Sequence, residues 1–351
     1  MNADAWRGRR VLVTGHTGFK GAWLTFLLEA AGAHVSGLAL EPPSSPSLHA
    51  LAGSEGDGLD RVDIRDGAAV AARVSAVEPE VIFHLAAQSL VRSAFADPAG
   101  TYAVNVLGTA NVLDAARKSA SIRAAVVVTS DKVYEPHADG RPHGEDSPLG
   151  GVDPYSSSKA ACELVASAYR RTYFAPAGVG VATARAGNVI GGGDWATDRV
   201  VPDVVRALGR SEPVRLRHPD AVRPWQHVLD PLHGYMLLAE SLLAAPADAP
   251  AALNFGPDPA EACSVAELVE RLTAGFGGQP GWSADPEATT APETAALRID
   301  ASRAQETLGW SPQLDLEEGL RWTVEWYRAH AAGENPRQLT LGQIATYRER
   351  L

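Results

Sequence analysis

The sequence predicts an α/β protein with a doubly wound parallel sheet, followed by a smaller C-terminal lobe. Short runs of apolar, β-branched residues alternate with longer segments of helical spacing, as expected when helices connect parallel strands. The runs are apolar without alternation, so both faces of each strand should be buried under helices. A chain of 351 residues with 45% apolar side chains is long enough for this sheet and a second lobe.

The predicted elements follow one another regularly along the first half of the chain. Strands are expected at residues 10–15, 34–40, 81–87, 124–130 and 178–187, and helices at residues 19–32, 67–77, 98–118 and 154–174. After about residue 190 the rhythm loosens, with helices expected at 198–210, 230–244 and 264–276, a surface loop at 275–296 and helical spacing from 297 to about 330. We therefore expect a Rossmann-type nucleotide-binding domain over residues 1–190. Residues 191–351 should form mainly a substrate-binding lobe, with some segments returning to the first domain.

Charge and cysteine content exclude several classes of protein. Lys and Arg total 31 against 42 Asp and Glu, which gives a net charge of −11, and no basic cluster is present. Such a chain is not expected to bind nucleic acid or an anionic membrane. Two cysteines are too few for a disulfide scaffold, and the histidine spacings match no metal motif, so no metal is expected. The N-terminus lacks a signal-peptide core and no apolar run is long enough to cross a bilayer, so we expect a cytoplasmic protein.

The first strand leads into a glycine-rich loop that is typical of a phosphate site. Gly15, Gly18 and Gly21 are separated by two residues each, and an apolar helix begins inside the loop. Glycines let the backbone approach a pyrophosphate, whose charge is stabilised at the helix N-terminus. The spacing GxxGxxG differs from the commoner GxGxxG, and glycines alone also fit an ordinary strand–helix turn. In this context we expect a dinucleotide, held by Gly15, Thr17, Gly18, Phe19, Lys20 and Gly21.

The end of the second strand gives weaker evidence about which dinucleotide binds. Ala39 occupies the usual position of the acid that holds the adenosine ribose, and Glu41 follows two residues later. No arginine is expected nearby to hold a 2′-phosphate, which favours NAD over NADP. Asp63 and Ile64 are candidates for the adenine edge, although a solvated Asp63 at a strand end is an equal alternative.

The helix that begins at residue 154 carries the best candidate for a redox site. Tyr155 and Lys159 are four residues apart and therefore lie on one face of this helix. A phenol beside an ammonium should have a lowered pKa and exchange a proton with a substrate hydroxyl during hydride transfer. Ser130 ends the strand at 124–130 and is placed to hydrogen-bond the same hydroxyl, because ligands bind beyond the carboxyl ends of strands.

Four more segments occur in the order found in a known superfamily. They are residues 84–87 (HLAA), 105–109 (NVLGT), 185–188 (RAGN) and 308–312 (LGWSP). With the glycine loop and the Tyr155/Lys159 pair, this set resembles the extended branch of the short-chain dehydrogenases/reductases over about residues 8–330. The resemblance implies NAD as cofactor, a nucleotide-sugar substrate, and a homodimer or dimer-based oligomer formed through helices 98–118 and 155–174. The alternative is that both helices simply pack on the sheet.

The same resemblance assigns further contacts. It places Leu85, Ala86, Ala87 and Thr129 beside the cofactor, together with Tyr155 and Lys159. It places Gln88, Ser89, Asn188, Arg199 and Arg223 beside the substrate. A planar guanidinium clamps phosphate oxygens well, so Arg199 and Arg223 are candidates for the substrate diphosphate. The alternative for each arginine is a solvated surface charge.

The residues after Ser130 indicate the reaction class. Epimerases of this branch carry small hydroxyl or alanine side chains there, whereas nucleotide-sugar 4,6-dehydratases carry an acid/base pair. Asp131 and Lys132 resemble the pair in dehydratases that act on CDP-glucose, as do residues 15–21, 191–195 (GGGDW) and 223–228 (RPWQHV). The resemblance implies oxidation at C4, loss of water across C5 and C6, and return of the hydride to C6.

This chemistry needs two groups besides the redox pair. We expect Asp131, kept protonated, to be the acid for the departing C6 hydroxyl. Lys132 is expected to be the base at C5, which requires a neutral amine, or to stabilise the enolate charge only. The structural alternative is that Asp131 and Lys132 only form a turn at the surface. The functional alternatives are another nucleotide-sugar 4,6-dehydratase, an epimerase, and a catalytically silent NAD-binding protein.

Overall fold

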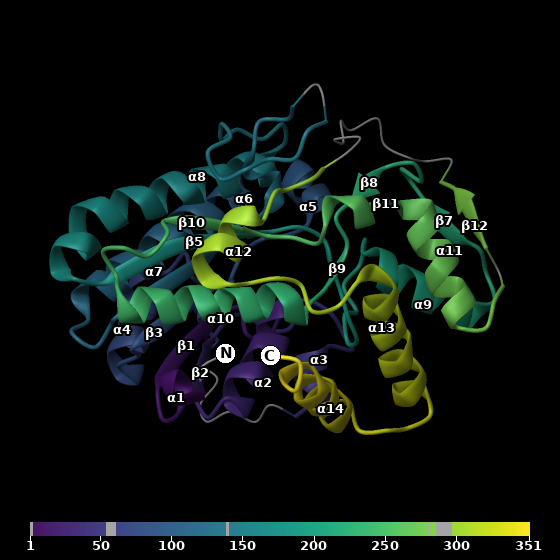
Figure 1. Cartoon of the computed structure of the whole chain (residues 1–351), viewed down its shortest axis with the longest axis horizontal. Helices are drawn as coiled ribbons and strands as arrows, with labels where there is room; N and C mark the ends of the chain where they lie inside the picture. Colours follow the sequence, from purple (N-terminus) through teal and green to yellow (C-terminus); the bar gives the residue numbers. More distant parts are fainter. Residues whose placement is uncertain (1–2, 54–60, 138–139, 280, 286–296) are drawn as a thin grey trace.

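The structure is a computed structural model that describes residues 3–53, 61–137, 140–279, 281–285 and 297–351. Six parallel strands form the central sheet in the order β10-β5-β4-β3-β1-β2 (Figure 1). They are β1 (Arg10–Thr14), β2 (His34–Leu38), β3 (Val81–His84), β4 (Ala124–Val128), β5 (Gly180–Ala186) and β10 (Ala252–Phe255). The chain runs outward from β1 to β2 and returns with β3 on the other side of β1. The predicted doubly wound sheet is confirmed, and its ligand site is expected at this change of direction.

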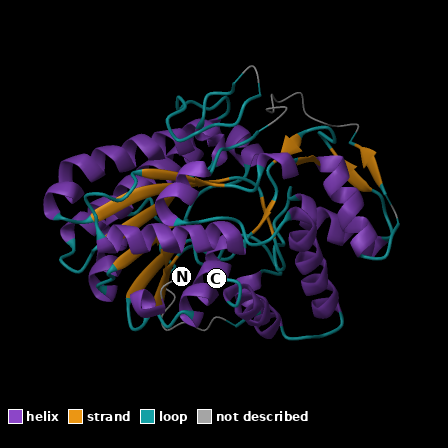
Figure 2. Ribbon diagram, viewed as in Figure 1, coloured by secondary structure: helices purple, strands orange, loops and turns teal. Residues whose placement is uncertain are grey.

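Helices cover both faces of the sheet because successive strand residues point to opposite sides (Figure 2). On one face, Val11 and Val13 pack in a core with α2 (Phe19–Ala30) and α10 (Leu229–Ala244). On the other face, Leu12 and Ile82 pack with α4 (Gly67–Val77), α7 (Gly108–Lys118) and α8 (Pro154–Tyr169). Burial on both faces explains why the strands are apolar without alternation.

Each of two predicted helices contains a π-helical turn, in which each amide bonds to the carbonyl five residues earlier. The predicted helix 98–118 consists of α6 (Pro98–Tyr102), the π-helical turn η1 (Ala103–Leu107) and α7. The predicted helix 154–174 consists of α8 and a second π-helical turn, η3 (Arg170–Phe174). Such turns add a residue locally and are often found at functional sites. The hydrophobic pattern predicted the extent of both helices without revealing these turns.

Residues after 190 contribute to both parts of the molecule. β10 pairs with β5 in the central sheet, and α10 packs against β4 and β5. The lobe gathers at one end of the sheet (Figure 1) around α9 (Val200–Arg210), α11 (Val265–Gly275) and α13 (Leu316–Ala331). Its short paired strands are β6 (Val189–Ile190) with β9 (Gln226–His227), β7 (Val214–Leu216) with β12 (Trp282–Ala284), and β8 (Val222–Arg223) with β11 (Cys263–Ser264).

The remaining elements are short or lie at the C-terminus. They are α1 (Ala3–Trp6), α3 (Leu48–Leu51), α5 (Val91–Ala96), α12 (Ser302–Leu308) and α14 (Pro336–Arg348), with the 3-10 turns η2 (Asp131–Val133), η4 (Ala175–Ala177) and η5 (Pro259–Glu261). The predicted loop 275–296 contains β12, and its residues 280 and 286–296 lie outside the described residues. None of the helices that the structure describes is long and apolar enough to span a bilayer.

Candidate active site

A cavity of about 1080 Å³ lies at the carboxyl ends of β1, β3, β4 and β5. It is lined by the glycine loop, the residues that follow β4 and the first turns of α8, together with residues of α9 and β7 from the lobe. This volume is at the upper end of the range for small-molecule sites, as expected where a cofactor and a substrate bind together.

The glycine loop is shaped for close approach of a phosphate. Gly15 has a φ of +75°, and a Cβ atom there would lie 2.7 Å from the backbone nitrogen of Ala86. A Cβ on Gly21 would lie 2.1 Å from the carbonyl oxygen of Gly15. Gly18 caps the N-terminus of α2 without a side chain that accepts from its amides. The loop therefore fits a dinucleotide, whose pyrophosphate can be met by backbone N–H groups and the helix dipole.

The structure corrects the sequence analysis beside β2. Residues 39 and 61 form an isolated parallel bridge, which brings Arg61 next to Ala39 although 22 positions separate them. Arg61 donates from Nε to Glu41 at 2.6 Å. The expectation that no arginine stands nearby is therefore wrong, because the fold supplies one. Glu41 forms an ion pair with this arginine. The end of β2 therefore carries both a carboxylate, which can accept from a ribose hydroxyl, and a guanidinium group.

Tyr155 and Lys159 are both buried at the first turns of α8. The Lys159 ammonium donates to the carbonyl oxygen of Val128 at 3.0 Å, and burial lowers its pKa. Burial raises the pKa of Tyr155 to about 12, and the opposing effects of a hydrogen bond with Ser130 and the charge of Arg199 are smaller. The expectation that Lys159 lowers the Tyr155 pKa is wrong for this arrangement, because burial dominates and the ammonium is bonded to the backbone.

Asp131 and Lys132 line the same cavity from the turn η2. Ser130 supports this turn, since its Oγ donates to Asp131 Oδ1 at 3.0 Å and accepts from the Lys132 amide at 3.2 Å. Asp131 is 3% exposed, and its Oδ2 has no hydrogen-bond partner among the described residues. Burial raises the pKa of Asp131 against the charges of Lys132 and Arg223. The surface-turn alternative is therefore wrong for Asp131, and its burial shifts the carboxyl group toward the protonated form.

Gly187 explains how the Asp131 carboxyl group fits into this space. A Cβ atom on Gly187 would lie 2.7 Å from Asp131 Oδ2 and 2.9 Å from Cγ of Pro224. The segment 185–188 was identified from the order of motifs. The structure adds a physical reason for its glycine, which is room for this carboxyl group.

The residues predicted to bind substrate lie mostly on the lobe side of the cavity. Arg199 approaches Ser89 with Nη2 3.5 Å from Oγ. Arg223 is 3% exposed and its charge acts on Asp131. Asn188, which precedes both arginines in the chain, also lines the cavity. Both arginines line the cavity, and their contact with a diphosphate remains a prediction.

Gln88 is the exception, because the structure does not bring it to the cavity. Its side-chain amide donates to the carbonyl of Leu90 and to Thr101, and its oxygen accepts from the Leu90 amide. The side chain thus stabilises its own turn. Gln88 is not among the residues that line the cavity, and its substrate contact remains a prediction.

Asn105 is a residue near the site to which the sequence analysis gave no role. The π-helical turn η1 carries it, and it is 1% exposed. Its side chain accepts from the Gln88 amide at 2.8 Å and donates to Ser158 at 2.8 Å. Ser158 in turn donates to the carbonyl of Tyr155. An asparagine inside an apolar helix was the signal that a buried polar contact exists there.

The cavity collects nearly all the predicted site residues. Those expected beside the cofactor that line it are Gly15, Thr17, Gly18, Phe19, Lys20, Gly21, Asp63, Ile64, Leu85, Ala86, Ala87, Thr129, Tyr155 and Lys159. Those expected in catalysis or substrate binding that line it are Ser130, Asp131, Lys132, Ser89, Asn188, Arg199 and Arg223. Their contacts with ligands remain predictions.

Comparison with known proteins places this arrangement in a family. Residues 12–323 match the family model described as GDP-mannose 4,6 dehydratase. The chain belongs to this family. The CDP-glucose 4,6-dehydratase of Salmonella typhimurium is 41% identical to it, over 99% of this chain and 98% of that protein. The dTDP-glucose 4,6-dehydratase of Streptomyces griseus is 31% identical, over 93% and 96%.

A solved structure of a related enzyme has the same fold. The UDP-glucose 4-epimerase of Thermus thermophilus, in complex with NAD, is 26% identical with a TM-score of 0.78, over 91% of this chain and 99% of that chain. The resemblance to extended short-chain dehydrogenases/reductases is confirmed. The cavity of this family member holds Asp131 and Lys132 together with Tyr155 and Lys159.

Proposed function

We propose that this protein is a CDP-glucose 4,6-dehydratase, which converts CDP-D-glucose to CDP-4-keto-6-deoxy-D-glucose with NAD as cofactor. One observation carries the proposal: Asp131 and Lys132 share the cavity with Tyr155 and the glycine loop. Oxidation alone needs only the redox pair, whereas elimination of water needs an additional acid and base. The 41% identity to the Salmonella typhimurium enzyme supports CDP-glucose as the substrate.

The glycine loop is where NAD fits. Backbone amides at the N-terminus of α2 would bind the pyrophosphate, and Asp63 and Ile64, which line the cavity, would meet the adenosine end. When bound, NAD would supply the hydride acceptor for C4 and the hydride donor for C6. The chain supplies orientation and proton transfer.

Tyr155 handles the proton of the C4 hydroxyl during oxidation. Its side chain lies beside Ser130, which orients the same hydroxyl, and the Lys159 ammonium provides a fixed positive charge on the same helix face. Burial is the largest reason that the Tyr155 pKa is raised to about 12, so additional positive charge at the site is needed to favour the phenolate.

Asp131 and Lys132 handle the water that leaves. The buried Asp131 carboxyl protonates the departing C6 hydroxyl. Lys132 removes the C5 proton, which the new C4 ketone has made acidic, or stabilises the enolate that forms. Arg199 and Arg223 hold the diphosphate, with Asn188 and Ser89 beside it.

Transfer of label within the sugar tests this function directly. The protein is incubated with NAD and CDP-glucose that carries deuterium at C4, and the product is analysed by NMR and mass spectrometry. We expect deuterium at C6 of a 4-keto product and no net reduction of NAD. Loss of the label to solvent, or absence of product with CDP-, dTDP-, UDP- and GDP-glucose alike, would contradict the proposal.

The assembly and location of the enzyme are part of the same proposal. We expect a homodimer through α6, α7 and α8, because Leu107 is 50% and Leu164 is 64% exposed on these elements and both are large apolar side chains. Tyr102 and Tyr173 are also exposed on this part of the molecule.

We also propose that the enzyme works in the cytoplasm. Cys162 and Cys263 are free thiols, as expected in a reducing compartment.

A further inference from the structure

The turn that carries Asp131 and Lys132 is too short to hold their side chains by itself. It is a single 3-10 turn, Asp131–Val133, and Ser130 provides its local side-chain contacts. Asp131 nevertheless keeps Oδ2 buried, with no hydrogen-bond partner in the described part of the chain. A turn of three residues has no helical periodicity to fix its side chains. The direction of this carboxyl group therefore depends on how the residues next to the turn are held.

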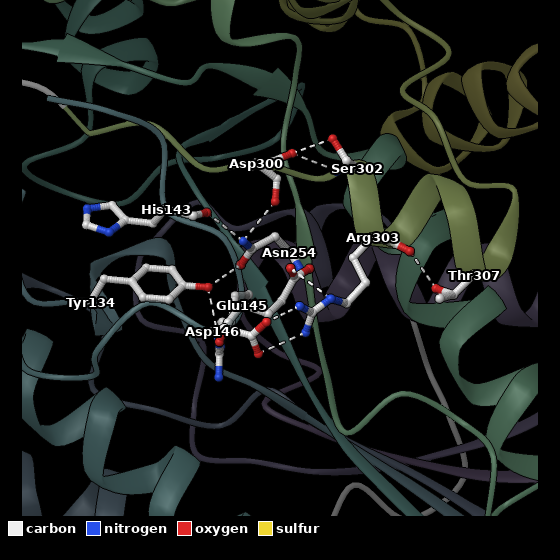
Figure 3. Close-up of polar contacts among 10 residues, drawn as sticks. Tyr134, His143, Glu145, Asp146, Asn254, Asp300, Ser302, Arg303 and Thr307 are labelled. Atoms are coloured by element: carbon white, nitrogen blue, oxygen red, sulfur yellow. Dashed lines mark hydrogen bonds and ion pairs between the residues drawn. The ribbon is translucent and has the colours of Figure 1, made fainter.

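Tyr134 is the residue that follows the turn, and contacts with other segments hold it in place (Figure 3). It is 3% exposed, and its hydroxyl donates to Asn254 Oδ1 at 2.6 Å. Arg185 donates from Nη1 to the same hydroxyl at 2.8 Å, and the Tyr134 ring stacks on His143 with ring centres 4.8 Å apart. Burial raises the pKa of Tyr134 to about 12, so the hydroxyl keeps the proton that it donates to Asn254.

Asn254 is itself fixed from three sides, as Figure 3 shows. It lies on β10 of the central sheet and is fully buried. Its Nδ2 donates to the carbonyl oxygens of His143 and Asp300, both at 2.9 Å. Its backbone amide donates to Glu145 Oε1 at 2.9 Å. The acceptor of the Tyr134 hydroxyl therefore cannot shift without disturbing the sheet and two other segments.

Arg185 connects the other side of this hydroxyl to the redox helix. It lies on β5 and forms a buried ion pair with Glu163 of α8, in which Nη2 and Oε2 are 2.7 Å apart. Glu163 also accepts from Thr129 at 2.5 Å, and Thr129 immediately precedes Ser130. The Tyr134 hydroxyl thus lies between the helix of the redox pair and the sheet edge at β10.

We propose that the Tyr134 hydroxyl is a positioning group for the elimination step, which keeps the Asp131 carboxyl directed at the departing C6 hydroxyl. This inference rests on the proposed function. Tyr134 acts through the turn and needs no contact with the substrate. Its loss should slow the departure of water and leave oxidation at C4 nearly unchanged, because Tyr155 is held by α8. A role in stability alone would impair both steps together.

Tyr134→Phe separates these outcomes, because it keeps the stacked ring and removes only the hydroxyl. The variant is mixed with NAD and CDP-glucose, absorbance at 340 nm follows reduced cofactor, and quenched samples give the 4-keto-6-deoxy product. We expect reduced cofactor to form within about twofold of the wild-type rate, and its decay and product formation to slow about 10- to 100-fold. The variant should therefore accumulate reduced cofactor on the protein.

Tyr347→Phe is the matched control. Tyr347 is also fully buried, and its hydroxyl donates to Asp230 at 2.8 Å, away from the cavity. It should change neither rate. Asn254→Ala is a second variant: it removes the same hydrogen bond together with the two that Nδ2 donates to His143 and Asp300, and it should also slow elimination more than oxidation.

Equal slowing of oxidation and elimination, or no change in either, would overturn the role of Tyr134. The wild-type protein distinguishes this from failure of the proposed function. If it forms neither reduced cofactor nor product with CDP-, dTDP-, UDP- and GDP-glucose, the proposed function fails and the inference fails with it.

Discussion

The redox pair and the dehydration pair lie in one cavity but are supported in different ways. Tyr155 and Lys159 are one turn apart on α8, a helix of 16 residues. Asp131 and Lys132 are adjacent on a turn of three residues. The helix places its two side chains by its own periodicity and backbone hydrogen bonds. The turn has no such periodicity, so its geometry depends on Ser130, Tyr134 and residues far away in the sequence.

This difference matters for how each pair responds to substitution. Changes near α8 should act mainly through the side chain that is lost, because the rest of the helix stays packed against the sheet. Changes near η2 should act through geometry, because one lost contact releases both side chains.

The largest effect is expected from Tyr155→Phe. Without the phenol, no group at this position exchanges a proton with the C4 hydroxyl, so oxidation and every later step are lost. We expect kcat to fall by about 10²- to 10⁴-fold, with no reduced cofactor at 340 nm. Tyr169→Phe, on the same helix and outside the cavity lining, is the matched control and should keep its activity. A Tyr155→Phe variant that retains a large fraction of wild-type activity would contradict the assignment.

The next effect concerns the pH dependence of elimination. Burial raises the pKa of Asp131, so the protonated acid persists to higher pH than in an ordinary aspartate. Elimination should be fast below this pKa and should decline as the pH rises through it, because the acid form is then lost. In Asp131→Asn we expect product formation about 10²-fold slower and without this alkaline decline, since Asn does not titrate.

The measurement is the rate of 4-keto product formation against pH, for the wild type and Asp131→Asn. Reduced cofactor should accumulate in the variant, because oxidation at C4 continues. An alkaline decline of unchanged position in Asp131→Asn would mean that another group titrates. Asp131 would then not be the acid of the elimination step. The two pairs would differ only in how the helix α8 and the turn η2 hold their side chains.

The sequence predicted those parts of the molecule that depend on local periodicity. The parallel sheet, the glycine loop and the Tyr155/Lys159 face all follow from spacing along one element. Contacts between distant segments were not predictable. Arg61 reaches Glu41 only because a short bridge pairs residues 39 and 61, and Gln88 leaves the cavity only because its turn provides better partners.

The buried network behind the dehydration pair was missed for the same reason. Arg185 stands in an otherwise apolar strand, which indicates a buried partner, but nothing in the sequence identifies Glu163 or Tyr134 as that partner. The pKa of Tyr155 was also mispredicted, because proximity to Lys159 is visible in the sequence and the extent of burial is not. Burial and long-range pairing are properties of the fold as a whole.

The smallest effect, expected from Asp153→Ala, tests whether α8 supports its pair independently of the turn. Asp153 caps the helix, since its Oδ1 accepts from the Ser156 amide at 2.9 Å. Loss of an N-cap costs about 1 kcal/mol, so the melting temperature should fall by a few degrees.

Asp315→Ala is the control, because it removes the corresponding cap of α13. The Asp315 side chain accepts from the Glu318 amide at 2.8 Å, and its loss should lower the free energy of unfolding by a similar amount. In both variants the ratio of accumulated reduced cofactor to product should match the wild type, because the described residues show no hydrogen bond from either capping side chain to η2. If Asp153→Ala alone shifts this ratio toward reduced cofactor, the start of α8 also holds the dehydration pair, and the two pairs share one support.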